Sequence, residues 1–217
     1  LEIATGASIT GASDLNIGGN LVLNGALSTN STYSISGSIQ GTGTQSGSGT
    51  MKLVGSGQTV SGATLQNLEV NTTGTSLSGS PVINGLLNLS AGQISLGNFN
   101  LTTGTINSTV ARYVVTNGTG SLKMTPPAAA TRTYPVGSST SSYDPVTLNL
   151  TNSVPMAVNV KATTVAGDFP GTIANYANVV HRLWDITPTG TPGSTVVTLT
   201  NGAADYTPTT PVAGHYN

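Results

Sequence analysis

Short apolar runs alternate with small polar residues along the first half of the chain. A typical run places Tyr33 and Ile35 on either side of Ser34. Alternation with a period of two is typical of a β-strand, whose successive side chains point to opposite faces. Glycine, serine and asparagine separate the runs, as they do in turns. The pattern therefore predicts many short strands rather than helices.

A Thr-Gly-Thr triplet recurs at residues 42–44, 73–75 and 103–105, with nearly even spacing. Alignment on this triplet places apolar positions in columns, one of which contains Ile35, Leu65 and Leu96, with three strand-like segments in each block. A coil that stacks on copies of itself has such a period, because one coil alone cannot bury its apolar side. We therefore expect a parallel β-solenoid over residues 1–110, with three to four coils of about 30 residues.

An unrepeated β-sandwich is the alternative for this half of the chain. The abundance of Thr and Gly gives one Thr-Gly-Thr by chance, so only the even spacing favours a repeat. Asn-Gly pairs at residues 24–25 and 84–85 are also typical of hairpins. Hairpins, however, need no period of this length, and the solenoid remains the preferred interpretation.

The pattern changes near residue 110, where prolines become frequent and the strand candidates become longer. These candidates are residues 112–116, 121–125, 145–150, 158–163, 179–186 and 195–200. Such strands, separated by turns rich in Pro, Gly, Ser and Thr, fit an antiparallel β-sandwich-like module over residues 111–217. Both ends of the sequence lie close to strand-like runs, and we expect a fragment of a longer chain.

Charged residues make up 6% of the sequence, against roughly 25% in an ordinary soluble domain. The six Lys and Arg residues are scattered singly, so no basic stripe predicts binding to nucleic acid. No apolar run approaches the roughly 20 residues that a membrane-spanning helix needs, and we expect no membrane insertion. The absence of cysteine excludes disulfides and thiolate metal sites.

The sequence offers few groups for catalysis. Glycan-cleaving β-helices need clustered carboxylates, whereas the seven acidic residues here do not recur with the repeat. The two histidines, His181 and His215, lie in different predicted segments, and no Gly-x-Ser-x-Gly motif joins a strand to a helix. We therefore expect no enzyme activity, no catalytic residue and no cofactor.

Two candidates for ligand binding lie in the second half of the chain. Asp144, Asp168 and Asp205 flank predicted turns, where carboxylates either cap the turn or join backbone carbonyls around a structural Ca²⁺. Without an Asp-x-Asp-x-Asp run, the turn-capping role is the preferred one. Trp184 lies in an alternating segment, and we interpret it as a core anchor rather than a sugar-stacking platform.

Several segments resemble the β-strand repeats of large Bacteroidetes-type surface proteins. In the first half these are residues 64–71 (TLQNLEVN), 80–89 (SPVINGLLNL) and 96–106 (LGNFNLTTGTI). In the second half, residues 113–123 (YVVTNGTGSLK), 134–137 (YPVG), 143–148 (YDPVTL) and 181–186 (HRLWDI) resemble the module that follows such repeats. The resemblance implies an exported adhesin, stalk or fibre at the bacterial cell surface, commonly secreted by the type IX route.

We therefore expect a structural segment of a cell-surface adhesin or filament, whose partners are neighbouring domains of the same chain or further copies of it. Free strand edges at a solenoid end give such an assembly a mechanism. The alternative is a glycan- or ice-binding module that uses a Ser/Thr-rich face. Its predicted ligand face consists of Thr42, Thr44, Thr73, Thr75, Thr103 and Thr105.

Overall fold

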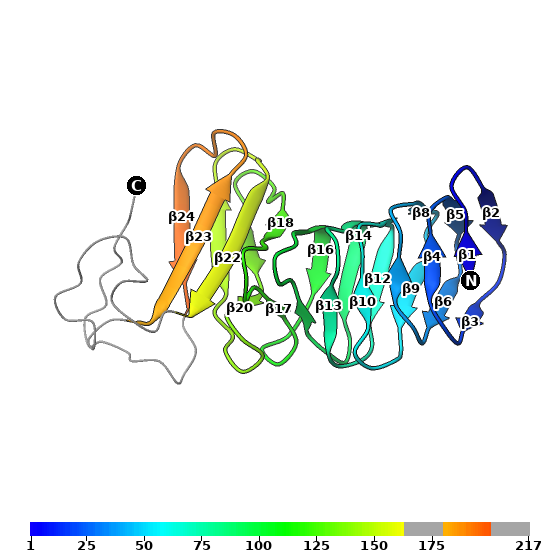
Figure 1. Ribbon diagram of the computed structural model, residues 1–217. Helices are drawn as coiled ribbons and strands as arrows, with labels where there is room; N and C mark the ends of the chain where they lie inside the picture. Colours follow the sequence, from blue (N-terminus) through cyan, green and yellow to red (C-terminus); the bar gives the residue numbers. More distant parts are fainter. Residues whose placement is uncertain (163–179, 201–217) are drawn as a thin grey trace.

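The computed structural model describes residues 1–162 and 180–200, and every regular element in these residues is a β-strand. Figure 1 shows a rod of short strands that begins at the N-terminus, with longer strands in two layers at the other end. The strands of the rod pair in parallel, and those of the layered end, here called the cap, pair mainly antiparallel. The predicted fold, a parallel β-solenoid followed by an antiparallel sandwich-like module, is confirmed.

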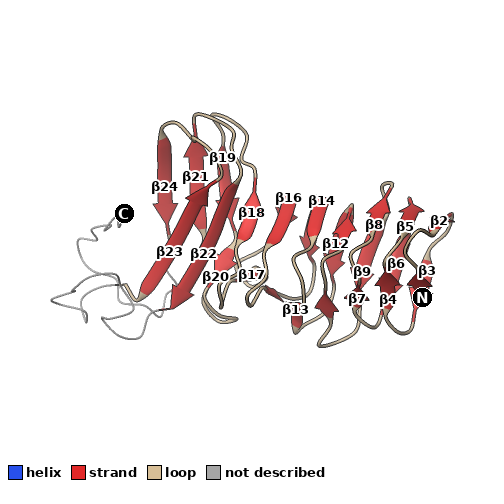
Figure 2. Cartoon of the chain, turned by 45° about the horizontal axis from the view of Figure 1, so that its top comes forward, coloured by secondary structure: helices blue, strands red, loops and turns tan. Residues whose placement is uncertain are grey.

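The rod has three ladders of parallel strands, and successive coils of the chain contribute to each ladder (Figure 2). Ladder A consists of β1 (Glu2–Ile3), β4 (Leu21–Leu23), β7 (Ile39–Gln40), β10 (Thr59–Val60), β13 (Thr75–Leu77), β15 (Ile94–Ser95), β17 (Val114–Val115) and β20 (Val136–Gly137). Ladder B starts with β2 (Ser8–Gly11), β5 (Ala26–Thr29), β8 (Thr44–Ser46) and β11 (Thr64–Leu65). Ladder C starts with β3 (Leu15–Ile17), β6 (Thr32–Ile35), β9 (Thr50–Leu53) and β12 (Asn67–Val70). Two longer strands, β14 (Val82–Leu89) and β16 (Leu101–Asn107), continue both ladder B and ladder C.

The coils are shorter than the sequence pattern predicts. Along ladder A, Thr59 pairs with Ser76 and Val114 pairs with Val136, so one coil takes roughly 20 residues. The predicted period of about 30 residues is therefore wrong, and the eight strands of ladder A replace the expected three to four coils. With strands about 4.8 Å apart, the seven steps between them give a rod of roughly 34 Å.

The predicted column of Ile35, Leu65 and Leu96 is also wrong. Ile35 lies in ladder C beside Leu53, whereas Leu65 lies in ladder B beside Ile83. Leu96 directly follows β15 of ladder A. The predicted period covers about one and a half of the observed coils, so it compares strands on different faces of the rod. All three residues are fully buried, which explains why they share an apolar pattern without being stacked.

Stacked apolar side chains form the core of the rod. Because the strands are parallel and in register, each inward residue lies directly over an inward residue of the next coil. One such column in ladder C contains Ile17, Ile35, Leu53, Val70 and Leu89. All five are no more than 7% exposed, and they belong to one hydrophobic cluster that continues into the cap.

Gln45 is a polar member of an otherwise apolar column in ladder B. It pairs with Leu27 of the preceding coil and is 2% exposed. Its Nε2 donates hydrogen bonds to the carbonyl oxygens of Ser46 and Gly49, at 3.1 and 3.2 Å, and its Oε1 accepts one from the Gln66 backbone N–H at 2.6 Å. The buried amide is therefore satisfied, and it joins a turn of its own coil to the next coil.

Side-chain oxygens extend the ladders through the turns. Asp14, Asn20 and Asn30 each accept a hydrogen bond from a backbone N–H in the next coil, with distances of 2.8 to 2.9 Å. Asn98 and Asn100 accept the equivalent bonds further along the rod. These oxygens take the place of a backbone carbonyl where the chain turns outward, so the coils stay bonded between strands.

The cap is joined to the last coils of the rod through shared strand pairing. Strand β18 (Leu122–Met124) pairs in parallel with β16 and antiparallel with β22 (Met156–Ala162), which in turn pairs with β23 (Arg182–Pro188). A second sheet contains β19 (Thr131–Tyr134), β21 (Val146–Leu150) and β24 (Thr195–Leu199), all antiparallel. Buried residues of both layers, among them Leu148 and Val158, belong to the same hydrophobic cluster.

Parallel pairing continues past residue 110, because β17 pairs with β20 and β16 pairs with β18. The change from parallel to antiparallel pairing therefore lies beyond the expected division between residues 110 and 111. Each of the six predicted strands of the second half overlaps an observed one, although the candidates 158–163 and 179–186 extend into positions outside the described residues. The short strands β19 and β20 were not predicted.

Close coil stacking requires glycine at certain turns. A Cβ atom on Gly43 would lie 2.3 Å from the carbonyl oxygen of Gly25 in the neighbouring coil, whereas a Cβ on Gly18 would meet nothing within 4 Å. We predict that Gly43→Ala lowers the free energy of unfolding by about 1–3 kcal/mol, because neighbouring backbone must move. Gly18→Ala, the matched control, should leave it unchanged or raise it slightly. Chemical denaturation followed by circular dichroism measures both, and equal stabilities for the two variants would contradict this account.

Candidate functional site

The structure does not bring the six threonines of the predicted ligand face together. Thr44 and Thr105 point outward from ladders B and C, and Thr42 and Thr73 lie in turns. Thr75 and Thr103 point inward and are 1% and 2% exposed. The predicted stack is therefore not present, because the alignment on Thr-Gly-Thr compares different faces of the rod.

A different hydroxyl-bearing column lies on the outer face of ladder B. Register pairs connect, coil by coil, Ser8, Ala26, Thr44, Thr64, Val82 and Thr102. Beside this column, Thr10, Ser28 and Ser46 form a second one in the first three coils. Thr44 is thus the only residue of the predicted face that belongs to these two columns.

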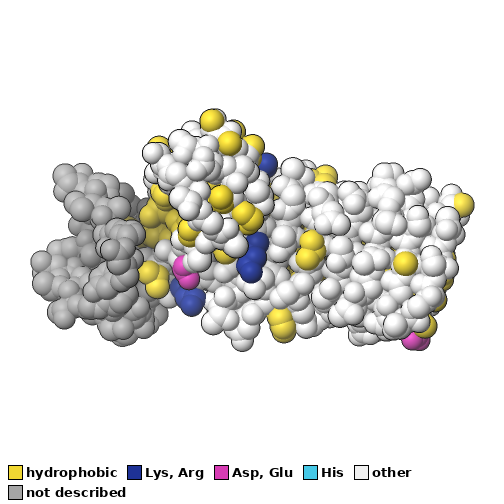
Figure 3. Space-filling model, turned by 90° about the horizontal axis from the view of Figure 1, so that it is seen from above, with side chains coloured by type: hydrophobic (Ala, Val, Ile, Leu, Met, Phe, Trp, Pro, Cys, Tyr) yellow, Lys and Arg dark blue, Asp and Glu magenta, His cyan; other side chains and the backbone are white. Residues whose placement is uncertain are grey.

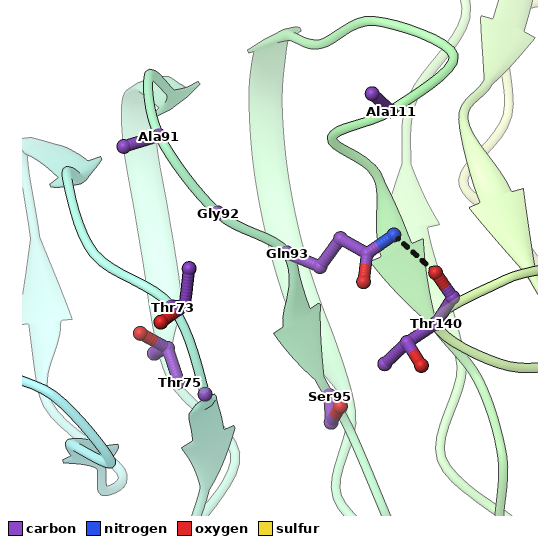
Figure 4. Close-up of a pocket in the computed structure, with 9 residues that line it drawn as sticks. Thr73, Thr75, Ala91, Gly92, Gln93, Ser95, Ala111 and Thr140 are labelled. Atoms are coloured by element: carbon purple, nitrogen blue, oxygen red, sulfur yellow. Dashed lines mark hydrogen bonds between the residues drawn. The ribbon is translucent and has the colours of Figure 1, made fainter.

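A shallow groove of about 360 Å³ lies beside ladder A, across four successive coils (Figure 4). Its lining residues are Thr73, Gly74, Thr75, Ala91, Gly92, Gln93, Ser95, Ala111 and Thr140. None of them is charged, and their hydroxyl and amide groups offer hydrogen-bond donors and acceptors. Gln93 extends across the groove and its Nε2 donates a hydrogen bond to the Thr140 carbonyl oxygen at 3.0 Å.

The described residues contain a buried ion pair at the junction of rod and cap, and serine side chains form hydrogen bonds to both of its members. The Asp144 carboxylate is fully buried, and its Oδ2 lies 3.2 Å from Nε of Arg182, whose side chain is 9% exposed. Oδ2 also accepts hydrogen bonds from the backbone N–H and hydroxyl of Ser138, at 3.0 and 2.8 Å. Ser142 donates its hydroxyl to the same carboxylate and accepts a bond from Nη2 of Arg182 at 2.7 Å.

This cluster connects two separate parts of the chain. Asp144, Ser138 and Ser142 lie in the segment between β20 and β21, and Arg182 is the first residue of β23. Trp184, also on β23, donates its indole N–H to the Asp144 carbonyl oxygen at 3.2 Å. A buried charge is tolerated only when it is paired and hydrogen-bonded, and here that pairing holds β23 against the rod.

Tyr113 and Tyr143 surround the same junction. Their ring centroids lie 5.1 Å apart with planes tilted by 43°, and the Tyr113 hydroxyl donates to the Ser139 carbonyl oxygen at 2.9 Å. Burial raises the pKa of the Tyr113 phenol, and the nearby Asp144 charge raises it further. The phenol therefore stays a neutral hydrogen-bond donor at physiological pH, and it supports the loop rather than supplying a nucleophile.

The sequence predicts a turn at Asp144 but does not indicate its partner, Arg182. The two charged residues are far apart in the sequence, and no local pattern indicates that they meet. Trp184 is partly buried and packs against the hydrophobic cluster, as its interpretation as a core anchor predicts. His181 lies immediately before β23, whereas His215, Asp168 and Asp205 lie outside the described residues.

Within residues 1–162 and 180–200, no three His, Cys, Asp or Glu side chains lie close enough together to hold a metal ion. The same residues contain no helix of the length and apolar character needed to cross a bilayer.

No family model matches the chain, and comparisons with curated proteins and with solved structures likewise gave no match.

Replacement of Asp144 tests the structural role of the junction. We predict that Asp144→Ala lowers the free energy of unfolding by about 3–5 kcal/mol, because Arg182 would keep a buried charge without its carboxylate. Asp185→Ala is the matched control, since Asp185 lies on the same strand as Arg182 but is exposed. The fluorescence of Trp184, the only tryptophan in the sequence, reports unfolding of the cap during denaturation. Equal losses of stability in the two variants would contradict the assigned role.

Proposed function

We propose that the chain is a non-enzymatic structural segment, a stalk or fibre, of a large extracellular surface adhesin. The observation that carries this proposal is the unbroken stack of coils, in which one hydrophobic cluster runs from the first coil into the cap. Such a stack keeps any domains attached at its two ends a fixed distance apart. Each added coil lengthens it by about 4.8 Å without changing its cross-section.

The distribution of polar groups supports a spacer rather than a catalyst. The most buried charged groups, Asp144 and Arg182, are enclosed and engaged with each other and with serine hydroxyls. The outer faces carry mostly small uncharged side chains, and the groove beside ladder A is shallow and uncharged. These features keep the rod hydrated and regular, and within the described residues they place no reactive group in an accessible cleft.

The proposed location is the bacterial cell surface, reached by the type IX route. It rests on the resemblance of residues 64–71, 80–89 and 96–106 to repeats of Bacteroidetes-type surface proteins. In the structure these stretches lie in strands β11, β12, β14 and β16 and in the turn after β15, within three consecutive coils. The residues that carry the resemblance thus contribute directly to the stack.

A spacer should tolerate the loss of one whole coil. Thr44 and Thr64 are register partners, so deletion of residues 44–63 joins Gly43 to Thr64 and keeps all three ladders aligned. We predict a folded variant in which the distance between Cα atoms of residues 8 and 102 falls from roughly 24 to roughly 19 Å. The chain has no cysteine, so Ser8→Cys and Thr102→Cys provide unique sites for spin labels and a distance measurement.

The control is a deletion of half a coil, residues 44–53, which brings strands of different ladders into register. This variant should lose cooperative unfolding, because its inward and outward residues no longer stack. In cells that produce the protein, antibodies should label the wild-type chain and the whole-coil deletion from outside, without permeabilisation. A folded half-coil variant, or labelling that requires permeabilised cells, would count against a surface spacer.

Binding of a glycan or of ice is the second candidate function, and the outer column of ladder B favours it. Thr44, Thr64 and Thr102 point outward in register along this column, with Ser28 and Ser46 in the adjacent one. A flat array of hydroxyl groups spaced by the strand separation matches a repetitive hydroxylated ligand.

A double variant tests this second function. If the face binds such a ligand, Thr44→Leu with Thr64→Leu should lower binding roughly tenfold or more, because two central hydroxyls are lost. Thr32→Leu with Thr50→Leu, register partners on ladder C, is the matched control and should bind normally. Glycan-array binding and the shape of growing ice crystals are the measurements. No binding by the wild-type chain, or equal binding by both variants, would eliminate this face as the ligand site.

A further inference from the structure

Three asparagine–glycine pairs lie in the described residues, at positions 24–25, 84–85 and 117–118, and a fourth, at 201–202, lies outside them. An asparagine before glycine can lose its side-chain ammonia, because glycine has no side chain to hinder attack by its own backbone nitrogen. In each of the three described pairs the asparagine is exposed and the glycine is half-buried. Exposure therefore does not distinguish one pair from another.

The hydrogen bonding of the glycine nitrogen does distinguish them. The N–H of Gly25 donates to the Ile3 carbonyl oxygen at 2.9 Å, and that of Gly85 donates to the Gln66 carbonyl oxygen at 2.8 Å. Both acceptors belong to the preceding coil, so these nitrogens become free only when the coil opens locally. Within residues 1–162 and 180–200, the N–H of Gly118 has no hydrogen-bond acceptor, and its nitrogen needs no such opening.

Close stacking of the coils explains why position 118 requires glycine. Residue 118 lies in the turn between β17 and β18, where a Cβ atom would be 2.2 Å from the carbonyl oxygen of Gly97 in the preceding coil. Any larger residue would displace that backbone. The fold thus requires, directly after Asn117, the residue type that leaves an asparagine most open to attack.

The same turn attaches the cap to the rod. Asn159 of β22 is 2% exposed, and its Nδ2 donates a hydrogen bond to the Gly118 carbonyl oxygen at 3.1 Å. The Thr116 hydroxyl accepts a bond from the Val160 N–H and donates one to the Val160 carbonyl oxygen, both at 2.9 Å. Asn117 therefore lies between two points at which the rod is bonded to β22.

We propose that Asn117 is a site of spontaneous deamidation and that the isoaspartate formed there loosens the cap from the rod. The Gly118 nitrogen attacks Cγ of Asn117, so that a new N–Cγ bond forms and the Cγ–Nδ2 bond breaks. The side-chain nitrogen leaves as ammonia, with the proton of the Gly118 N–H. Water then opens the cyclic imide at either carbonyl, which gives aspartate or isoaspartate.

Isoaspartate is the product that disturbs the junction. It carries the side-chain methylene of residue 117 within the backbone, so the chain between Thr116 and Gly118 becomes longer by one carbon. The two anchors on β22 then no longer match the spacing of Asn159 and Val160. This modification is independent of the proposed spacer function, because it concerns the stability of the cap and not the length of the rod.

The rates at the three pairs test the site. We predict that the folded protein, kept in mildly alkaline buffer, loses ammonia from Asn117 at least roughly tenfold faster than from Asn24 or Asn84, because the last two react only after local opening. Mass spectrometry of a tryptic digest measures each rate. Cleavage after Lys and Arg places the three pairs in separate peptides, 1–52, 53–112 and 113–123.

Unfolded protein is the matched control for these rates. In concentrated urea the coil hydrogen bonds are absent, so the three pairs should react at similar rates. Similar rates in the folded protein, or a rate at Asn117 no higher than at Asn24, would overturn the assignment.

The effect on the cap is measured on aged protein. Figure 3 shows few charged side chains on this face of the rod, and the formal net charge of the chain is −1, so one new carboxylate makes it −2 and ion-exchange chromatography separates the modified protein. Trp184 is the register partner of Val160 and reports unfolding of the cap. Its fluorescence should change at a lower denaturant concentration in the isoaspartate form than in fresh protein.

Two variants separate charge from backbone length. Asn117→Asp adds the carboxylate without the extra backbone carbon and should unfold at nearly the same denaturant concentration as fresh protein. Asn117→Gln would need a larger ring to cyclise, so it should stay unmodified and keep its cap stability after ageing. An isoaspartate form that unfolds like fresh protein, or an equal loss of stability in aged Asn117→Gln, would contradict the proposed loosening.

Discussion

The structure depends on the requirement that each coil returns to within one strand spacing of the coil before it. Parallel strands about 4.8 Å apart exchange backbone hydrogen bonds only if every turn brings the chain back in register. Turn length varies, because the coil from Thr59 to Ser76 is shorter than the coil from Val114 to Val136. The turns meet the requirement with glycines that permit close backbone approach and with Asn and Asp side chains that accept bonds from the next coil.

The same constraint accounts for the scarcity of charge. Outward residues of successive coils lie directly over one another, so two like charges in one column would be about 5 Å apart and would repel by roughly 1–3 kcal/mol. Lys52 and Glu69, a charged pair in a column of the rod, have opposite signs and a separation of 3.1 Å. Uncharged polar side chains avoid this repulsion, and the pair Asn88 and Asn107 forms a hydrogen bond of 2.9 Å between neighbouring coils.

The sequence predicts the fold class more accurately than it predicts the length of a coil or which residues stack. Alternation around Tyr33 and Ile35 locates strands, because burial on one face imposes it locally. The period is harder to identify, because strands of different ladders share that alternation and polar inward residues such as Gln45 and Thr103 interrupt the true columns. The ion pair of Asp144 and Arg182 is not predicted for another reason. It depends on a contact between the segment after β20 and strand β23, which are distant in the sequence.

The ends of the rod, rather than its sides, concentrate the features that an isolated solenoid cannot satisfy. Along the sides, backbone groups are bonded from coil to coil and apolar residues are stacked inside. At the cap, the antiparallel strands that follow β18 and the Asp144 cluster close the stack. A sheet edge is removed only by pairing, and β22 provides that pairing for β18, the strand that continues the rod beyond β16.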